Sequence, residues 1–373
     1  MQKSSKIKVL LIAGARPNFM KIAPLIRAFK EHKDYFQVDL VHTGQHYDIQ
    51  MSDVFFKELR IPKPNISLEV GSASHAAQTA QIMLAFEKVL LKKKPGLIIV
   101  VGDVNSTMAC SLVAAKMNVP IAHVEAGLRS GDREMPEEIN RIVTDSLSDY
   151  LFVSEESGLC NLKKEGVSAS KVFYVGNIMI DTLLSNMPKI SKSKALTTYG
   201  LQPKTYSVLT LHRPGNVDSK KALEEIYAIL RAVSTKIKIV YPIHPRTKKM
   251  IDKHDFRRRF ENLNDLYMID PLGYIDFMKL VKESRFVLTD SGGIQEETTV
   301  LGIPCLTMRE NTERPITIEQ GTNILIGRDQ LKITKEVNKI LNGRSKKGGI
   351  PKYWDGKTAQ RIVRILRKHN TPG

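Results

Sequence analysis

The sequence has few cysteines and no long apolar run, and both absences exclude classes of protein. Its three cysteines, Cys110, Cys160 and Cys305, are far apart and form no CxxC pair, so we expect reduced, mostly buried thiols. No stretch reaches the roughly 18 apolar residues that a membrane-spanning helix needs. The segment KVLLIAGA is too short for a signal-peptide core and predicts a buried strand. We therefore expect a cytoplasmic protein without a membrane partner.

Two glycine-rich nucleotide signatures are also missing. The sequence has neither the GxGxxG fingerprint of dinucleotide-binding folds nor the GxxxxGK[ST] loop of P-loop proteins. Its histidines and cysteines do not occur at zinc-site spacings. We therefore expect no cofactor and no metal.

Acidic residues are outnumbered by basic ones, and the formal net charge is +18. An excess of this size can indicate nucleic-acid binding. The basic clusters are far apart, however, and lack interleaved aromatic residues: 92–94, 257–259 and 346–347. We interpret them as solvated faces of a basic enzyme and expect no nucleic-acid partner, although a positive field would favour an anionic substrate.

Short apolar runs alternate with helix-like stretches, a βαβ rhythm that predicts parallel sheets covered on both faces. The strands expected in the first half are 6–13, 37–42, 97–101, 119–123, 150–153 and 172–175, and the helices are 18–32, 47–59, 75–93, 106–117, 136–148 and 155–166. We interpret the polar segment 186–205 as an inter-domain region. Beyond it the expected strands are 206–211, 237–241, 266–269, 285–289 and 303–307, and the helices are 219–234, 274–283, 293–301 and 356–369.

Unusual polar segments follow many of the predicted strands: GARPNFMK, TGQHYD, GDVNST, VEAGLRS, LHRPGN, IHPRT and TDSGGIQEE. Ligands of doubly wound sheets bind at the carboxyl ends of the strands. Two such halves usually leave a cleft between them, so we expect the site in an interdomain cleft bordered by these segments.

The segment TDSGGIQEE has the features of a phosphate site. Gly292 and Gly293 would expose backbone N–H groups at a helix start, where the helix dipole also favours an anion. Ser291 could add a hydroxyl or simply cap the helix. Glu297 lies four residues beyond Gly293, about 6 Å further along the same face, which suits ribose hydroxyls, whereas Glu296 points elsewhere. The alternative is an ordinary capped helix with acidic residues in its first turn.

Several cations also follow predicted strands. Arg16 and Lys21 come after the first strand and could meet a diphosphate, although a helix start with surface cations is the simpler interpretation of that segment alone. His212 follows the first strand of the second half, and His244 with Arg246 follows the next. Two His–Arg loops beside a predicted phosphate site favour anion binding.

Three carboxylates are candidates for acid and base catalysis. Asp103 and Glu125 end buried strands, where an acid needs partners. Glu137 could instead form only a local pair with Arg141, four residues further along a helix. Carboxylates that converge in one cleft can have pKa values pushed apart, which would give one acid and one base.

In this order, the motifs resemble the non-hydrolysing UDP-N-acetylglucosamine 2-epimerase family. The resemblance covers roughly residues 7–366, and its motifs are GARPNFMKIAP, HTGQHYD, GDVNST, HVEAGLRSGDREMPEEINR, VGNIMIDTL, LHRPGNVD, PIHPRTKK, DPLGYIDF, LTDSGGIQEE and MRENTERP. It implies a glycosyltransferase-B-like pair of Rossmann-type domains, here 1–182 and 183–355, with helix 356–373 packing back on the first domain. It also implies a homodimer and a role in polysaccharide or cell-surface glycan precursor synthesis.

The resemblance implies three groups of site residues. The first binds the nucleotide, with Glu297 at the ribose and Phe277 at the uracil largely through its main chain: Arg16, Phe277, Ser291, Gly292, Gly293, Glu297 and Arg314. The second surrounds the sugar and the leaving group: Lys21, Asp103, Glu125, Glu137 and His212. The third matches positions that some bacterial members use for a second, activating UDP-sugar: Gln45, His46 and His244.

The sequence departs from the family's pattern at three places. Asn18 stands where many relatives have Glu, Leu272 stands where some have Gln near the base, and segment 71–75 lacks an arginine of allosterically regulated members. The nucleotide assignment does not depend on these positions, whereas activation by a second substrate does. The sugar also stays open, because closely similar sequences epimerise UDP-diacetamido-uronic acids.

The family resemblance implies an elimination. The C2 proton of UDP-N-acetylglucosamine is not beside a carbonyl, and no nicotinamide site is visible that would create one. In the implied route UDP leaves from C1 while a base removes the C2 proton, and UDP adds back after reprotonation from the opposite face. The alternatives are a hydrolysing epimerase and a glycosyltransferase on the same architecture.

Overall fold

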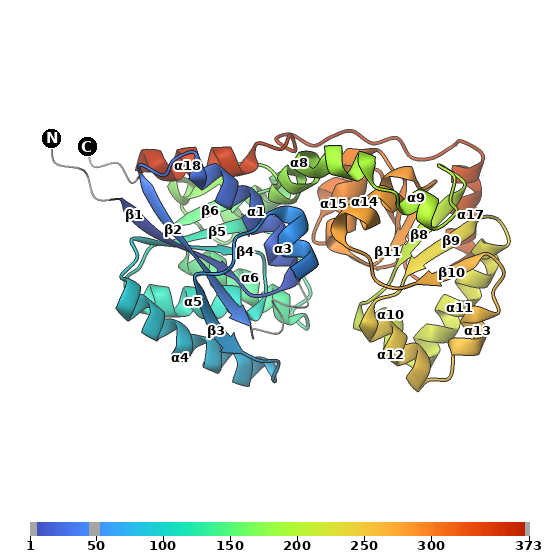
Figure 1. Cartoon of the computed structure of the whole chain (residues 1–373), viewed down its shortest axis with the longest axis horizontal. Helices are drawn as coiled ribbons and strands as arrows, with labels where there is room; N and C mark the ends of the chain where they lie inside the picture. The colour runs from blue at the N-terminus through green and yellow to red at the C-terminus, as the bar shows by residue number, and fades with distance from the viewer. Residues whose placement is uncertain (1–5, 45–52, 370–373) are drawn as a thin grey trace. The chain divides into compact units, whose positions relative to one another are not determined.

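The computed structural model describes residues 6–44 and 53–369, which form two compact units. The first unit runs to Ser185 and includes the C-terminal segment from Lys352, and the second comprises Asn186–Pro351. Each unit is built on one parallel sheet with helices packed against it (Figure 1). The predicted fold class, α/β with two Rossmann-like domains, is therefore confirmed.

The sheet of the first unit has seven strands in the order β3-β2-β1-β4-β5-β6-β7, all parallel. The strands are β1 (Ile7–Ala13), β2 (Phe36–Gly44), β3 (Ile66–Val70), β4 (Leu97–Val101), β5 (Ile121–Ala126), β6 (Tyr150–Val153) and β7 (Val172–Tyr174). Every residue of β4 is buried, as expected for a strand that is covered on both faces. The chain winds outward in both directions from the neighbouring strands β1 and β4, which form the switch point of the sheet.

Helices cover both faces of this sheet (Figure 1). They are α1 (Arg16–Lys30), α3 (Asp53–Leu59), α4 (His75–Lys93), α5 (Asn105–Lys116), α6 (Pro136–Leu147), α7 (Glu156–Lys164), α8 (Ile178–Lys192) and α18 (Thr358–His369), with a short 3-10 helix at Ala169–Lys171. Helices α4 and α5 pack on one face through Ile82, Phe86 and Val113. Helix α18 packs against α1.

The last helix is fixed to the first unit by Asp181 of α8. Its carboxylate accepts the N–H groups of Thr358 and Ala359 at 3.0 and 2.8 Å, and it thereby satisfies two donors of the first turn of α18. Burial raises the pKa of Asp181 to about 6. Just before this helix, the buried Trp354 donates its indole N–H to the carbonyl oxygen of Ser154 at 3.0 Å.

The sheet of the second unit repeats this topology with six strands in the order β10-β9-β8-β11-β12-β13. They are β8 (Tyr206–Thr210), β9 (Lys238–Pro242), β10 (Leu266–Ile269), β11 (Val287–Thr289), β12 (Cys305–Thr307) and β13 (Asn323–Leu325). The helices are α9 (Ala195–Thr198), α10 (Pro214–Val217), α11 (Lys220–Ser234), α12 (Pro245–Lys253), α13 (Arg257–Glu261), α14 (Tyr274–Glu283), α15 (Gly292–Leu301), α16 (Pro315–Glu319) and α17 (Gln330–Leu341). Strands β8 and β11 form the switch point here.

The segment 186–205, which we interpreted as an inter-domain region, contains the end of one helix and the whole of another. Helix α8 continues through Pro188 to Lys192, and α9 follows at Ala195. The apolar residues Ile180, Leu183 and Ile190 of α8 are buried, and their spacing places them on one helical face. The polar residues that suggested an inter-domain region alternate with these apolar residues along the helix.

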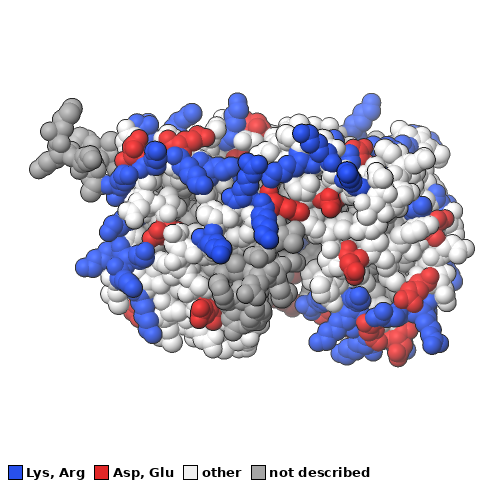
Figure 2. Space-filling model, in the orientation of Figure 1, with Lys and Arg blue, Asp and Glu red and all other residues white. Residues whose placement is uncertain are grey.

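The excess basic residues are spread over the surface with acidic residues among them (Figure 2). Lys93 pairs with Asp39 at 2.8 Å, and Arg257 pairs with Asp252 at 2.6 Å. These pairs agree with the interpretation of the clusters as solvated faces. Cys110 and Cys305 are buried and Cys160 is exposed, and all three are free thiols. Within residues 6–44 and 53–369, no helix combines the length and the apolar character needed to cross a membrane.

Candidate functional site

Most of the predicted site residues lie at the ends of strands that form or adjoin the switch points of the two sheets. In the first unit they lie at or after the ends of β1, β4 and β5, and in the second after β8, β9 and β11. This is the position at which doubly wound sheets bind ligands. Arg16 is the first residue of α1, whereas Gln45 and His46 lie outside the described residues.

A buried ion pair joins α1 to the end of β5 in the first unit. Lys21 donates to the Glu125 carboxylate, and their side chains are only 9% and 3% exposed. Gly102, at the end of β4, passes so close that a Cβ there would lie 2.7 Å from Lys21 Nζ. Glu125 itself has a φ of 73°, a conformation that costs a non-glycine residue about 1–3 kcal/mol. A buried charge pair and a strained backbone at one strand end are features of functional sites.

Asp103 directly follows Gly102 in the sequence and is held by an arginine from α6. Its Oδ2 accepts from Arg141 Nη1 at 2.5 Å, while Arg141 also donates to Glu138 at 2.8 Å. Asp103 keeps a third of its side chain exposed. The alternative of a local pair between Glu137 and Arg141 is therefore wrong, because Arg141 turns to Glu138, whose carboxylate also receives the N–H of Ser130.

Asn18 ties together the loops that carry these groups. Its Oδ1 accepts the N–H groups of Gly14 and Ala15, both at 3.0 Å, and its Nδ2 donates to the Val101 carbonyl at 3.0 Å. The turn after β1 is thereby fixed to the end of β4. A glutamate at this position could not donate to Val101, so this departure from the family's pattern changes how the two strand ends are joined.

Glu137 lines a polar cavity of about 320 Å³ in the first unit. The other lining residues are Gly14, Ala15, Thr43, Gly44, Val70, Gly71, Ser72, His75, Gln78, Ile82, Val104, Asn105, Ser106 and Asn140. Asn105 donates to Gln78 at 2.8 Å, and Asn140 donates to the Asp103 carbonyl at 2.9 Å. The volume is within the usual range for small-molecule sites, and the polar lining suits a hydroxylated ligand.

In the second unit, His212 is held by an acid that the sequence analysis did not select. Its Nδ1 lies 2.8 Å from Asp290 Oδ1, and Asp290 also accepts the backbone N–H groups of His212 and Arg213 at 3.0 and 2.9 Å. Burial acts to raise the pKa of Asp290, but the hydrogen bond and charge of His212 outweigh it and lower the pKa overall. The His212 side chain stays 40% exposed, and its ring lies 5.6 Å from that of His244.

The start of α15 leaves room for a ligand. A Cβ on Gly292 would meet no atom within 4 Å, so the space in front of this turn is open. Ser291 occupies the N-cap position but makes no capping hydrogen bond through its side chain. Its hydroxyl therefore does not serve the helix, and the alternative of a side-chain-capped helix is wrong.

The two acids of α15 have different partners. Glu296 pairs with Arg314 Nε, whereas Glu297 accepts the Tyr274 hydroxyl at 2.8 Å. Both carboxylates are buried and neither lies in the first turn, so the interpretation as solvated helix-start acids is also wrong. Burial raises the pKa of Glu297 to about 8, the Tyr274 hydrogen bond acts to lower it, and the Glu296 charge acts to raise it.

Helix α14 connects the predicted base and ribose positions. It carries both Tyr274, the partner of Glu297, and the half-buried Phe277. The Phe277 N–H donates to the Gly273 carbonyl at 3.0 Å, which fixes its main chain in the first turn. The Tyr274 hydroxyl thus joins the helix that carries Phe277 to Glu297.

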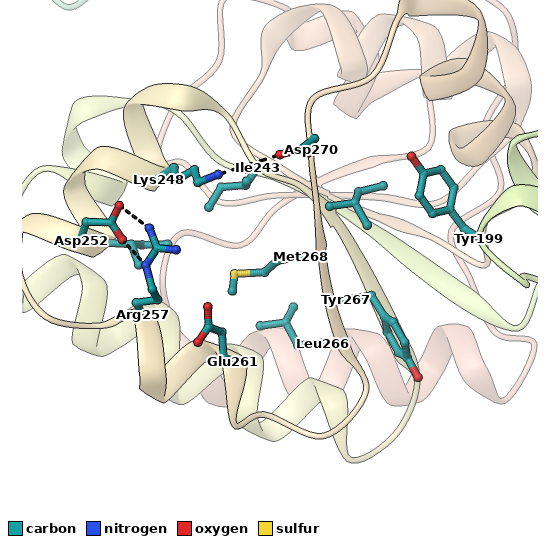
Figure 3. Close-up of a pocket in the computed structure, with 12 residues that line it drawn as sticks. Tyr199, Ile243, Lys248, Asp252, Arg257, Glu261, Leu266, Tyr267, Met268 and Asp270 are labelled. Atoms are coloured by element: carbon teal, nitrogen blue, oxygen red, sulfur yellow. Dashed lines mark hydrogen bonds and ion pairs between the residues drawn. The ribbon is translucent and has the colours of Figure 1, made fainter.

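A larger cavity of about 640 Å³ lies beside β10, at the edge of the second sheet (Figure 3). None of the predicted site residues lines it. Four of its charged groups form pairs with one another, since Arg257 pairs with Asp252 at 2.6 Å and Lys248 lies 3.9 Å from Asp270. We therefore do not assign the functional site to this cavity.

The structure thus groups the predicted residues within each unit. Lys21 and Glu125 form one cluster with the Gly102–Asp103 turn, and His212 and His244 form another. Sequence reasoning missed the residues that hold these groups: Glu138, Arg141, Tyr274 and Asp290. Asp290 was detectable, because it ends a buried strand in the same way as Asp103 and Glu125 do.

Comparisons with known proteins give one consistent result. Residues 27–367 match the family model described as UDP-N-acetylglucosamine 2-epimerase. A protein of that name from Methanocaldococcus jannaschii is 42% identical over 96% of this chain and 99% of its own length. Its crystal structure with UDP-GlcNAc and UDP has a TM-score of 0.89 and covers 97% of this chain and 100% of that one. The UDP-2,3-diacetamido-2,3-dideoxy-D-glucuronate 2-epimerase of Pseudomonas aeruginosa is 38% identical over 97% of this chain and 100% of its own length.

Proposed function

Because the chain belongs to the UDP-N-acetylglucosamine 2-epimerase family, we propose that it interconverts UDP-N-acetylglucosamine and UDP-N-acetylmannosamine without net hydrolysis. The observation that carries this proposal is the near full-length identity of 42% to a relative of that name. The carboxylates at the strand ends support it, because an epimerase that exchanges a proton needs acid and base groups.

The second unit supplies the UDP-binding groups in this proposal. The N–H groups at Gly292 and Gly293 and the Ser291 hydroxyl bind the diphosphate, in front of the open first turn of α15. Glu297 accepts the ribose hydroxyls, and Phe277 lies at the uracil.

Cations and a histidine stabilise the departing diphosphate. Arg16 and Arg314 contact the nucleotide, and His212 lies at the leaving group. Because Asp290 holds His212 through Nδ1, the other ring nitrogen faces away from that acid and is available to the leaving oxygen. Asp290 therefore has a positioning role.

The acids of the first unit exchange the proton. One carboxylate removes the C2 proton as the C1–O bond to UDP breaks and a C1–C2 double bond forms. A second group protonates C2 from the opposite face, and UDP then adds back to C1. Asp103, Glu125 and Glu137 are the candidates for these two steps, and Lys21 holds Glu125 in its place.

Four finer properties are also proposed, the location from the cysteine usage and the other three from the family resemblance. We propose that the enzyme is a cytoplasmic homodimer and that it supplies a precursor for polysaccharide synthesis. His244, with Gln45 and His46, remains a proposed site for a second, activating UDP-sugar. The contact between the His212 and His244 rings would place that site next to the leaving group.

The second candidate substrate is a UDP-2,3-diacetamido-uronic acid, favoured by the 38% identity to the Pseudomonas aeruginosa epimerase. A panel of UDP-sugars, with products identified by NMR, tests both candidates. We expect turnover of UDP-N-acetylglucosamine to UDP-N-acetylmannosamine. Turnover of the UDP-uronic acid alone would show that the second candidate is the substrate. Release of free N-acetylmannosamine would indicate a hydrolysing epimerase.

UDP affinity should increase with pH as Glu297 ionises. In the free protein burial raises the pKa of this carboxyl to about 8, so it is mostly protonated at neutral pH. Ribose hydroxyls that donate to the carboxylate favour its ionised form, so binding below this pKa releases a proton. Affinity should rise by up to about tenfold per pH unit below pH 8 and level off above it.

Titration calorimetry with UDP in buffers of different ionisation enthalpy measures both the affinity and the released proton. The matched variant is Glu297→Gln, which keeps the size of the side chain but cannot ionise. It should bind UDP with little pH dependence. An equal pH dependence in both proteins would exclude Glu297 as its source.

A further inference from the structure

A fully buried histidine lies on the same strand as one of the predicted acid and base groups. His123 is on β5, two residues before Glu125, and its side chain has no solvent exposure. Its Nδ1 lies 2.6 Å from Asp145 Oδ1, and its Nε2 lies 2.8 Å from the carbonyl oxygen of Gly102. Both ring nitrogens therefore face oxygen atoms of the protein.

The chemistry of these partners fixes the protons on the ring. A backbone carbonyl can only accept, so Nε2 carries a hydrogen. Asp145 accepts two further hydrogen bonds at Oδ2, from the Gly127 N–H at 2.9 Å and from Arg129 Nη1 at 2.8 Å. A carboxyl group that receives these donors is ionised, so Nδ1 also carries a hydrogen and donates to it. The ring of His123 is then an imidazolium ion.

The surrounding charges support this state. Asp145 lies between His123 and Arg129, and Arg129 also pairs with Glu165 at 2.7 Å. The four groups carry two positive and two negative charges, so the chain from the buried His123 to the exposed Glu165 is neutral as a whole. Burial acts to raise the pKa of Asp145, but His123 and Arg129 outweigh it and keep the pKa low.

The imidazolium holds the turn that leads into Asp103. The Gly102 carbonyl accepts from His123, while the Gly102 N–H donates to the Val124 carbonyl at 3.0 Å. Gly102 has a φ of 69° and passes against Lys21 on its other side. Both hydrogen-bonding groups of this glycine are fixed, and the next residue is Asp103.

We infer that His123 is a positioning residue with both ring nitrogens protonated, which together with Asp145 sets the place of Asp103 relative to Lys21 and Glu125. His123 does not touch the substrate in this scheme. Its effect on turnover rests on the proposed function, whereas its protonation state does not. A displacement of about 1 Å in a reacting group can lower a rate by about 100-fold, so losing this contact should affect turnover strongly.

The protonation state can be measured without any activity. Long-range nitrogen–proton NMR of the full chain with ¹⁵N-labelled histidine distinguishes an imidazolium from either neutral tautomer. We expect His123, identified by its loss in His123→Phe, to show two protonated nitrogens at neutral pH. A neutral ring at neutral pH would overturn the inference.

Kinetics test the positioning role. His123→Phe should lower kcat by about 10- to 100-fold and leave KM and the Kd for UDP within about twofold, because all of the proposed UDP-binding groups except Arg16 lie in the other unit. His254→Phe is the matched control, since the His254 ring also contacts a backbone carbonyl, that of Asp218 at 3.1 Å, and its activity should stay unchanged. Unchanged kcat in His123→Phe, or a parallel loss of UDP binding, would contradict positioning.

If His123→Phe does not fold, His123→Gln gives the same test with a side chain that can still donate to Gly102. It should keep more activity than any folded variant that lacks a donor at this position, such as His123→Leu. If the wild-type protein has no epimerase activity, the proposed function fails, and the NMR experiment still decides the state of His123.

Discussion

The Asp103→Asn variant should bind UDP normally and lose most of its turnover. General acid or base catalysis by a positioned carboxylate contributes about 10²- to 10⁴-fold, so kcat should fall by about that factor. The substitution keeps the shape of the side chain, and Arg141 retains its second partner, Glu138, at 2.8 Å. The fold should therefore be preserved. Steady-state kinetics and UDP calorimetry on the same preparation separate turnover from binding.

Asp39→Asn is the control for Asp103→Asn. Asp39 also pairs with a cation, Lys93, at 2.8 Å, but it lies on β2 away from the strand ends that carry the predicted site. Its kcat should match the wild type. A near-normal kcat in Asp103→Asn would remove Asp103 from the acid and base groups and leave Glu125 and Glu137.

Lys21→Met should destabilise the first unit by about 3–5 kcal/mol, because it removes the cation from a buried ion pair and leaves the Glu125 carboxylate inside. The sole tryptophan, Trp354, is buried in the same unit, so its fluorescence follows the unfolding of the part that contains the change. Denaturant titration should show an earlier midpoint for this variant. Kcat should fall as well, because Lys21 packs against the Gly102–Asp103 turn.

Two further variants test the cause of this loss. Lys93→Met breaks a more exposed pair and should change the free energy of unfolding by no more than about 1 kcal/mol. Lys21→Met combined with Glu125→Gln removes the buried charge and should recover part of the lost stability. If the double variant is as unstable as Lys21→Met alone, lost packing rather than an unpaired charge is responsible.

The sequence predicted most of the fold because buried parallel strands are continuous apolar runs. Strands 97–101, 150–153 and 266–269 have the predicted bounds. Strands β3 and β13 were not predicted, because both lie at sheet edges and are only partly buried, and β13 has three residues. A partly buried strand and a three-residue strand both lack a continuous apolar run, so their sequences do not distinguish them from loops.

Helices with many polar residues were the other source of error. The segment after β9 was interpreted as a loop, but α12 begins at Pro245 and is capped by the His244 side chain, which accepts the Arg246 N–H at 3.2 Å. Most of its residues are charged or polar, so its apolar periodicity is weak. Helix α17 was also missed, although Ile333, Val337 and Ile340 are spaced at helical intervals and are buried.

For the candidate site, sequence reasoning found positions but not partners. The strand-end rule placed Asp103, Glu125 and His212 at the carboxyl ends of strands, and the structure has them at the ends of β4, β5 and β8. The partners come from distant parts of the chain: Lys21 and Glu125 are 104 residues apart, and His212 and Asp290 are 78 residues apart. The one local pair that was considered as an alternative, between Glu137 and Arg141, is wrong because the arginine pairs with Glu138 and Asp103.

The most direct test of the proposed chemistry is the fate of the hydrogen at C2. The protein is incubated with UDP-N-acetylglucosamine in deuterated water, and the products are examined by NMR. Proton exchange by the strand-end acids predicts UDP-N-acetylmannosamine with deuterium at C2. An epimerised product that keeps its original hydrogen there would contradict the account, since no group of the site would then have exchanged a proton with the solvent.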